Sequence, residues 1–301
     1  MRIQTLGTVN DRLTFLGTRK SCVYLVKGEA HALMGGAGQW VVPELERQFH
    51  EWNVDMDRVR YLVLGHAHFD HCGAVPFLLR KYPHLQVIGS RGAAKLLGIP
   101  KAVQNIQKFS REATLRMGFP MEHEGISLEW EKTPLARVVE DGDILDLGQG
   151  MKLEFHEAPG HSRCGLITYI PSTRWLFPSD CLFVPSEDGE NFLCTASESY
   201  QVYRESLQKI AHLETELCAW EHHGIWTGDD ARGIVAQGIA WTRDYQSRIR
   251  EALAAGQDPE QLALDLSSEW LERAQFPFLV AEISQHIMRG MTSNATEEPL
   301  D

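Results

Sequence analysis

Long hydrophobic runs, paired cysteines and an excess of basic charge are all missing from this sequence of 301 residues. No apolar stretch approaches the roughly 18 to 20 residues that span a bilayer, and the first ten residues lack the apolar core of a secretory signal. The six cysteines stand singly without a CxxC pair, so neither a disulfide framework nor a cysteine-rich zinc site is indicated. We therefore expect reduced thiols, a cytoplasmic location and no membrane partner.

The charge balance is acidic, with 41 acidic against 29 basic residues and a net charge of −12. This is the wrong sign for a protein that neutralises phosphates along nucleic acid, so no nucleic-acid partner is expected. Hydrophobic residues at 43% and charged residues at 23% are close to globular averages, which speaks against disorder and against a fibrous architecture.

The order of the expected elements is typical of an α/β protein. Short β runs fill residues 13–35, helical spacing covers 41–52, a strand-like run follows at 60–64, and a second β-rich stretch spans 136–183. Between them, residues 91–117 are predicted to be mainly helical with a break at Pro100. After residue 228 the apolar spacing is helical at 229–255, 259–272 and 278–291, and the polar tail 292–301 is expected to fray. The sequence thus predicts a catalytic domain over 1–228 and a helical extension over 229–301 that caps the active site.

The cluster most informative about chemistry is Gly65-His66-Ala67-His68-Phe69-Asp70-His71, directly after the strand expected at 60–64. Imidazoles and carboxylates are costly to bury unless they are paired or bind a ligand. Two histidines one residue apart can point toward one cation, and a following turn can aim Asp70 and His71 at a second point nearby. Nitrogen and oxygen donors without thiolate suit Zn²⁺, Fe or Mn²⁺.

Three later loops offer further donors, each at the end of a strand-like run. They contain His161, Asp180 and the pair His222-His223. Loops that leave the strands of one sheet would bring these side chains to the same sheet edge.

These residues together resemble the metallo-β-lactamase-fold hydrolases, whose signature is H-x-H-x-D-H followed by a distant His, an Asp and a last His. The resemblance covers about residues 10–228 and includes the turn Asp141-Gly142-Asp143 before the strand that leads to the third histidine. It implies an α/β (α+β) fold of four layers, an αββα sandwich of two mixed sheets with helices outside and the metals at one edge.

Carried over residue by residue, the resemblance places His66, His68 and His161 on one metal. It places Asp70, His71 and His223 on a second metal, with Asp180 as the bridge. The last motif reads His222-His223-Gly224 where the family usually has Gly-His-Gly, and we take His223 as the ligand, with His222 as the alternative. Two such cations lower the pKa of a shared water, so that the resulting hydroxide attacks a polarised carbonyl or phosphoryl group. Asp70 would orient that hydroxide or relay a proton to the leaving group.

Within the superfamily, the segment HAHFDHCGAVPFL is most similar to the quinolone-signal response thioesterases of bacteria. It resembles glyoxalase II and the acyl-homoserine lactonases more distantly. The expected function is therefore hydrolysis of a thioester or ester of a small acyl or aroyl metabolite by a dinuclear centre of Zn or Fe, with Mn as a further choice. A phosphodiesterase or a lactonase on the same site is an alternative. Diiron redox enzymes of this fold usually carry Glu at the position of His68 and an added flavin domain, so the sequence does not favour that class.

Three further expectations concern partners and single residues. A role as a signalling or regulatory partner with secondary hydrolase activity stays open, as does a homodimer. Cys72 and Cys181 flank expected ligands and are interpreted as small buried hydrophobic residues. His286 is interpreted as a packing or surface residue of the last helix, with a place in the pocket as the alternative.

Overall fold

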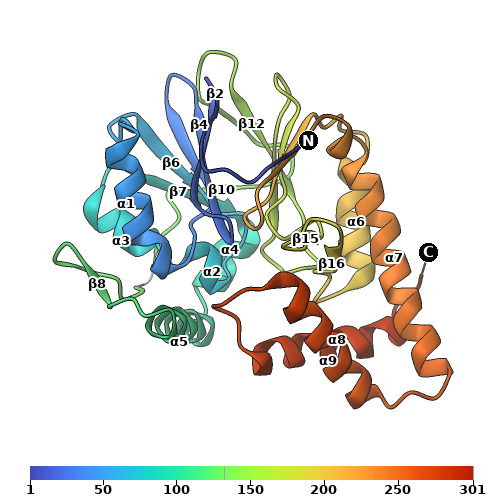
Figure 1. Cartoon of the computed structure of the whole chain (residues 1–301). Helices are drawn as coiled ribbons and strands as arrows, with labels where there is room; N and C mark the ends of the chain where they lie inside the picture. The colour runs from blue at the N-terminus through green and yellow to red at the C-terminus, as the bar shows by residue number, and fades with distance from the viewer. Residues whose placement is uncertain (132, 301) are drawn as a thin grey trace.

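Two seven-stranded sheets pack face to face at the centre of the protein (Figure 1). The computed structural model describes residues 1–131 and 133–300. The first sheet has the order β10 (Arg137–Val139), β7 (Gln86–Ser90), β6 (Val59–Val63), β5 (His31–Met34), β4 (Ser21–Lys27), β3 (Leu13–Thr18) and β2 (Gly7–Asn10). The second has the order β1 (Arg2–Ile3), β18 (Ile225–Thr227), β17 (Leu217–Ala219), β14 (Trp175–Phe177), β13 (Leu166–Ile170), β12 (Lys152–Glu157) and β11 (Ile144–Asp146). Two small ribbons pair β8 (Glu122–His123) with β9 (Ile126–Ser127) and β15 (Val184–Pro185) with β16 (Phe192–Leu193).

Helices cover the outer faces of both sheets. Figure 1 shows α1 and α3 outside the first sheet, α6 and α7 outside the second, and α5, α8 and α9 at one end of the sandwich. The helices are α1 (Val42–Glu51), α2 (Phe69–Cys72), α3 (Val75–Lys81), α4 (Arg91–Leu97), α5 (Pro100–Arg116), α6 (Tyr200–Ile210), α7 (Ile234–Ala254), α8 (Pro259–Ala274) and α9 (Ala281–Glu297), with short 3-10 turns η1 (Gln39–Val41) and η2 (Gly228–Asp230). The predicted four-layer sandwich with helices at its C-terminal end is confirmed.

Strands β3 and β4 are buried on both faces along almost their whole length. Tyr24 points toward the second sheet, where its ring lies 5.1 Å from that of Phe15 and 5.8 Å from that of Phe177. Its neighbours Val23 and Leu25 point the other way and join the cluster under the helices, as the alternation along a strand requires.

Several helix starts follow from local sequence chemistry. The side chains of Ser90, Ser199 and Asp258 each accept a hydrogen bond from the backbone N–H three residues later, which caps α4, α6 and α8. Pro100 opens α5 and Pro259 opens α8, at the first helical position, where a missing N–H costs nothing. The predicted break at Pro100 is confirmed.

The prediction that the tail 292–301 frays is wrong for residues 292–298, while Asp301 lies outside the described residues. Helix α9 continues to Glu297, and the next residue, Glu298, is tied to the start of α6. Its Oε2 accepts hydrogen bonds from the backbone N–H of Gln201 at 2.8 Å and from the hydroxyl of Ser199 at 3.1 Å. This long-range contact holds a segment whose local composition is polar.

No helix among the described residues is both long and apolar enough to cross a bilayer. The first long helix after the sandwich, α7, begins at Ile234, close to the predicted change of character after residue 228. The division of the chain into two domains at that point stays a prediction.

Candidate metal centre

Four loops meet at one edge of the sandwich and carry the chemically informative residues. In the second sheet β12, β14 and β17 run in the same direction, because β13 is antiparallel to both β12 and β14, and β14 is parallel to β17. The loops after these strands contain His161, Asp180 and the pair His222-His223. The segment after β6 of the first sheet carries the other cluster, with His66 and His68 in the loop and Asp70 and His71 in the short helix α2.

A first group consists of His66, His68 and His161. The Nδ1 atom of His68 lies 3.0 Å from Nε2 of His66 and 3.1 Å from Nε2 of His161. His66 and His161 are buried, and His68 lies at the wall of a cavity. The structure therefore brings together the three histidines predicted for the first metal.

A second group consists of Asp70, His71 and His222. The Nε2 atoms of His71 and His222 lie 3.1 Å apart, and Oδ2 of Asp70 lies 3.4 Å from the first and 3.8 Å from the second. Donors this close can share one cation.

Asp180 lies between the two groups. Its Oδ2 is 3.7 Å from Nε2 of His161, 3.2 Å from Nε2 of His71 and 3.7 Å from Nε2 of His222. Its Oδ1 is buried without a hydrogen-bond partner among the described residues. This is the position that the predicted bridge requires.

The expectation that His223 joins the second group is wrong in geometry, because His222 occupies that place. His223 adopts a φ of 62°, in the left-handed region, and its backbone N–H donates to the carbonyl of Arg19 at 2.6 Å. Its ring turns away from the cluster, stacks on Phe276, and places Nδ1 2.9 Å from Oε2 of Glu187.

The outward nitrogens of the clustered imidazoles are held by oxygen atoms. Nδ1 of His161 donates to the carbonyl of Thr195 at 2.8 Å, and Nδ1 of His222 donates to the carbonyl of Lys20 at 2.7 Å. A carbonyl only accepts, so both rings carry a proton on the outward Nδ1, and the neutral form of each ring presents its Nε2 lone pair inward.

The contacts between the inward-facing atoms of the cluster are those expected of the ligands of a cation. His71 also holds its Nδ1 proton outward, toward the carboxylate of Glu221 at 2.9 Å, yet its Nε2 faces that of His222. Two lone pairs at this distance repel each other unless a proton or a metal ion lies between them. With the carboxylates of Asp70 and Asp180 beside them, the donors have the nitrogen and oxygen chemistry of a divalent metal site.

Burial and neighbouring charges set the protonation of the donors. Burial, with His161 adding to it, lowers the pKa of His68 to about 3, so this ring is neutral and free to bind a metal over the physiological range. Burial alone would raise the pKa of Asp180, but His71 and His222 outweigh it and hold that pKa well below its usual range. The Asp180 carboxylate is thus ionised at neutral pH.

A cavity of about 930 Å³ opens beside the two groups. His68, Asp70, His161, Asp180 and His222 line one side of it. The other walls come mainly from aromatic and aliphatic side chains of α2, α5, α8, α9 and the segment between α8 and α9, namely Phe69, Phe109, Trp270, Phe276, Phe278, Leu279, Ile283 and Ile287. The alternative placement of His286 is the one observed, because its side chain also lines this cavity.

Comparison with known families agrees with this geometry. The model of the family described as the Metallo-beta-lactamase superfamily matches residues 16–222. The chain belongs to this superfamily. Members of the metallo-β-lactamase superfamily are generally metal-dependent hydrolases, which supports an enzymatic function, and the fold typically binds divalent metals through groups such as those described above.

Individual relatives are distant. The metallo-β-lactamase fold-containing protein ST1585 of Sulfurisphaera tokodaii is 24% identical over 67% of this chain and 72% of its own, and its crystal structure superposes with a TM-score of 0.57. The metallo-β-lactamase family protein TTHA1429 of Thermus thermophilus superposes with a TM-score of 0.60 at 19% identity, over 92% of this chain and 93% of its own. The putative diflavin flavoprotein A 2 of Synechocystis is 28% identical over 52% of this chain, which spans only 22% of that protein's length.

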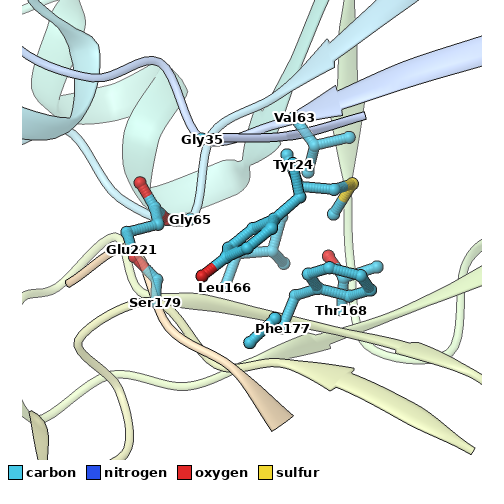
Figure 2. A pocket seen from close by; sticks show the side chains of 11 residues that line it. Tyr24, Gly35, Val63, Gly65, Leu166, Thr168, Phe177, Ser179 and Glu221 are labelled. Atoms are coloured by element: carbon cyan, nitrogen blue, oxygen red, sulfur yellow. The ribbon is translucent and has the colours of Figure 1, made fainter. Parts of the chain in front are cut away.

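A second layer of residues contacts the outward nitrogens of the clustered histidines. The sequence did not predict this layer. Figure 2 shows Glu221 and Ser179 side by side next to Gly65, with Tyr24 close by, around a cavity of about 10 Å³, which is room for roughly one water. Glu221 holds Nδ1 of His71, and the hydroxyl of Ser179 lies 3.0 Å from Nδ1 of His66.

Two glycines make room for this layer. A Cβ on Gly65 would lie 2.5 Å from Oε1 of Glu221, and a Cβ on Gly35 would lie 2.8 Å from Oε2. Gly35 also has a φ of 91°, which other residues rarely adopt. The turn after β5 and the turn after β6 therefore form a slot for one buried carboxylate.

A Glu221→Gln variant is expected to bind the second metal ion about 10- to 100-fold more weakly, while the first ion is retained. The amide keeps the volume but loses the negative charge that makes the His71 ring a stronger ligand. Chelator competition followed by metal analysis measures both affinities. The matched control is Glu154→Gln, which lies in strand β12 away from the cluster. Equal metal affinity in Glu221→Gln and in the wild-type protein would contradict the role assigned to Glu221.

Metal binding at the second group is expected to release a proton near neutral pH. Burial opposes charge on His71, but the carboxylates of Asp70 and Asp180 outweigh it and raise its pKa well above the ordinary value. The metal-free ring therefore carries a proton that the cation must displace, so affinity should rise about tenfold per pH unit below that raised pKa. Calorimetric titration of the metal in two buffers of different ionisation enthalpy measures the proton directly. Identical heats in both buffers would show that no proton leaves.

Proposed function

We propose that the protein is a dinuclear metal-dependent hydrolase that cleaves an ester-like bond, a thioester or an ester, in a small acyl or aroyl metabolite. The observation that carries this proposal is the position of the two donor groups on the wall of a large, mainly apolar cavity. Such a cavity binds an apolar group by burial, and the donor groups place the chemistry at one side of it.

Two bound divalent cations would supply Lewis acidity toward the substrate carbonyl and an acidified water as the nucleophile. The chain itself supplies the proton handling. Asp70 lines the cavity, and although burial works against its charge, His71 lowers its pKa, so the carboxylate is ionised at neutral pH. It can accept the proton of the attacking water and deliver it to the leaving group.

The charges around the cavity favour an acyl substrate over a phosphodiester. Among the described residues that line it, Arg289 is the one basic side chain besides histidine, and its Nε donates to both carboxylate oxygens of Glu260 at 2.9 Å. A polyanionic substrate would find little free positive charge apart from the metals themselves. The resemblance of the segment from His66 to Leu78 to thioesterases supports the same choice.

The experiment is a panel of thioesters, esters, lactones and phosphodiesters offered to the metal-loaded protein. We expect turnover of one or more thioesters or esters with apolar acyl groups, and none after metal removal. Failure to turn over any acyl compound, or turnover of phosphodiesters alone, would contradict the proposal.

A further inference from the structure

We infer that Phe276 is a positioning residue for the second metal ion, because its ring holds the face of the His222 imidazole. The helical C-terminal segment would then form part of the metal centre and not only a wall of the cavity. This inference rests on the proposed metal centre, and it is independent of the substrate.

The contact is made by a short aromatic segment between α8 and α9. The ring centroid of Phe276 lies 4.5 Å from that of His222, with the two rings tilted by 39°, and the centroid of Phe278 lies 5.9 Å from it at an interplanar angle of 23°. Phe276 also stacks on His223, at 5.1 Å and 10°. These distances are those of favourable ring pairs.

Lys20 makes hydrogen bonds both to His222 and to the aromatic segment. The backbone carbonyl of Lys20 accepts the hydrogen bond from Nδ1 of His222 at 2.7 Å, and the Lys20 ammonium donates to the carbonyl of Gln275 at 2.6 Å. The Arg116 guanidinium donates to the carbonyl of Phe278 at 2.9 Å. The aromatic segment is thus fixed to the sandwich at both of its ends.

The two kinds of contact are complementary. The hydrogen bond to Lys20 fixes the outer edge of the His222 ring but leaves it free to swing about that edge. The Phe276 ring covers one face and removes this freedom before a metal binds, so less conformational entropy is lost on binding.

In the described part of the chain, the segment between α8 and α9 makes no comparable ring contact with the first group. Among the ring contacts of the described residues, those of His66 and His161 are with other histidines of the cluster. Loss of the Phe276 ring should therefore weaken the second metal ion selectively.

The test measures Co²⁺ binding by chelator competition and by the visible absorption spectrum of each bound ion. Phe276→Ala should bind the second Co²⁺ about tenfold more weakly and alter its spectrum, with the first ion unchanged. Phe276→Leu, which keeps apolar volume, should give a smaller loss, and Phe276→Tyr, which keeps the ring, should restore the affinity. Leu279→Ala is the matched control, since Leu279 lies in the same segment and lines the cavity without stacking on a histidine.

Wild-type affinity and spectrum for the second Co²⁺ in folded Phe276→Ala or Phe276→Leu would overturn the inference. If both variants fail to fold, Lys20→Met decides it, because it removes the hydrogen bond that holds one end of the segment at Gln275 while leaving the Lys20 carbonyl that holds His222 in place. Unchanged binding in Lys20→Met would then overturn the inference, and weaker binding of the second ion would support it. Fewer than two Co²⁺ ions in the wild-type protein would overturn the proposed dinuclear centre as well as the inference. The wild-type result therefore distinguishes a failure of the metal centre from a failure of the role of Phe276 alone.

Discussion

An Asp180→Ala variant is expected to lose its metal ions and its hydrolase activity together. Among the described residues, Asp180 is the one carboxylate within 3.7 Å of donors from both groups, so its removal should deprive both metal ions of a ligand. Side chains that only support a ligand are worth about 10- to 100-fold in metal affinity, and loss of a shared ligand should exceed about 100-fold. Metal analysis after gel filtration, with turnover of the best acyl substrate, measures both effects.

The control for this variant is Asp229→Ala, which removes a carboxylate that is 95% exposed and pairs with Arg232. It should keep both metal ions and full activity, because an exposed ion pair contributes little. Full metal content in Asp180→Ala would contradict the bridging role, whatever happened to turnover.

The adjacent histidines 222 and 223 provide a matched pair of variants. His222→Ala should lose the second metal ion and nearly all activity, because its Nε2 faces the cluster. His223→Ala should keep both ions, because its ring stacks on Phe276 and faces Glu187 instead. We expect His223→Ala to lower the free energy of unfolding by about 0.5–3 kcal/mol, since it removes a buried ring.

Metal content, activity and thermal unfolding of the two variants settle the assignment. The reverse result, with His223→Ala losing the metal and His222→Ala keeping it, would restore His223 as the ligand. Equal loss in both variants would indicate that the local fold had collapsed, and the unfolding curves would show it.

The sequence predicted most of the site because its information is local. His66, His68, Asp70 and His71 lie within one short segment after a strand, and His161 and Asp180 each follow a strand of the second sheet. Strands that run in one direction end at one edge, so their loops must meet. The expectation that Cys72 and Cys181 are buried apolar residues is also confirmed, as each is 1% exposed.

What the sequence could not show depends on contacts between distant segments. The choice between His222 and His223 depends on a left-handed backbone at His223, which residue spacing does not reveal. The role of Glu221 depends on a slot formed by glycines of the other sheet. An acid directly before the pair His222-His223 was the signal available in the sequence, and only the fold shows that it supports His71.

The most direct test of the account is a crystal structure of the metal-loaded protein with the ions located by anomalous scattering. We predict two peaks, one among His66, His68 and His161 and one among Asp70, His71 and His222, with Asp180 between them. A single peak, no peak among these residues, or an ion bound by His223 would contradict the account.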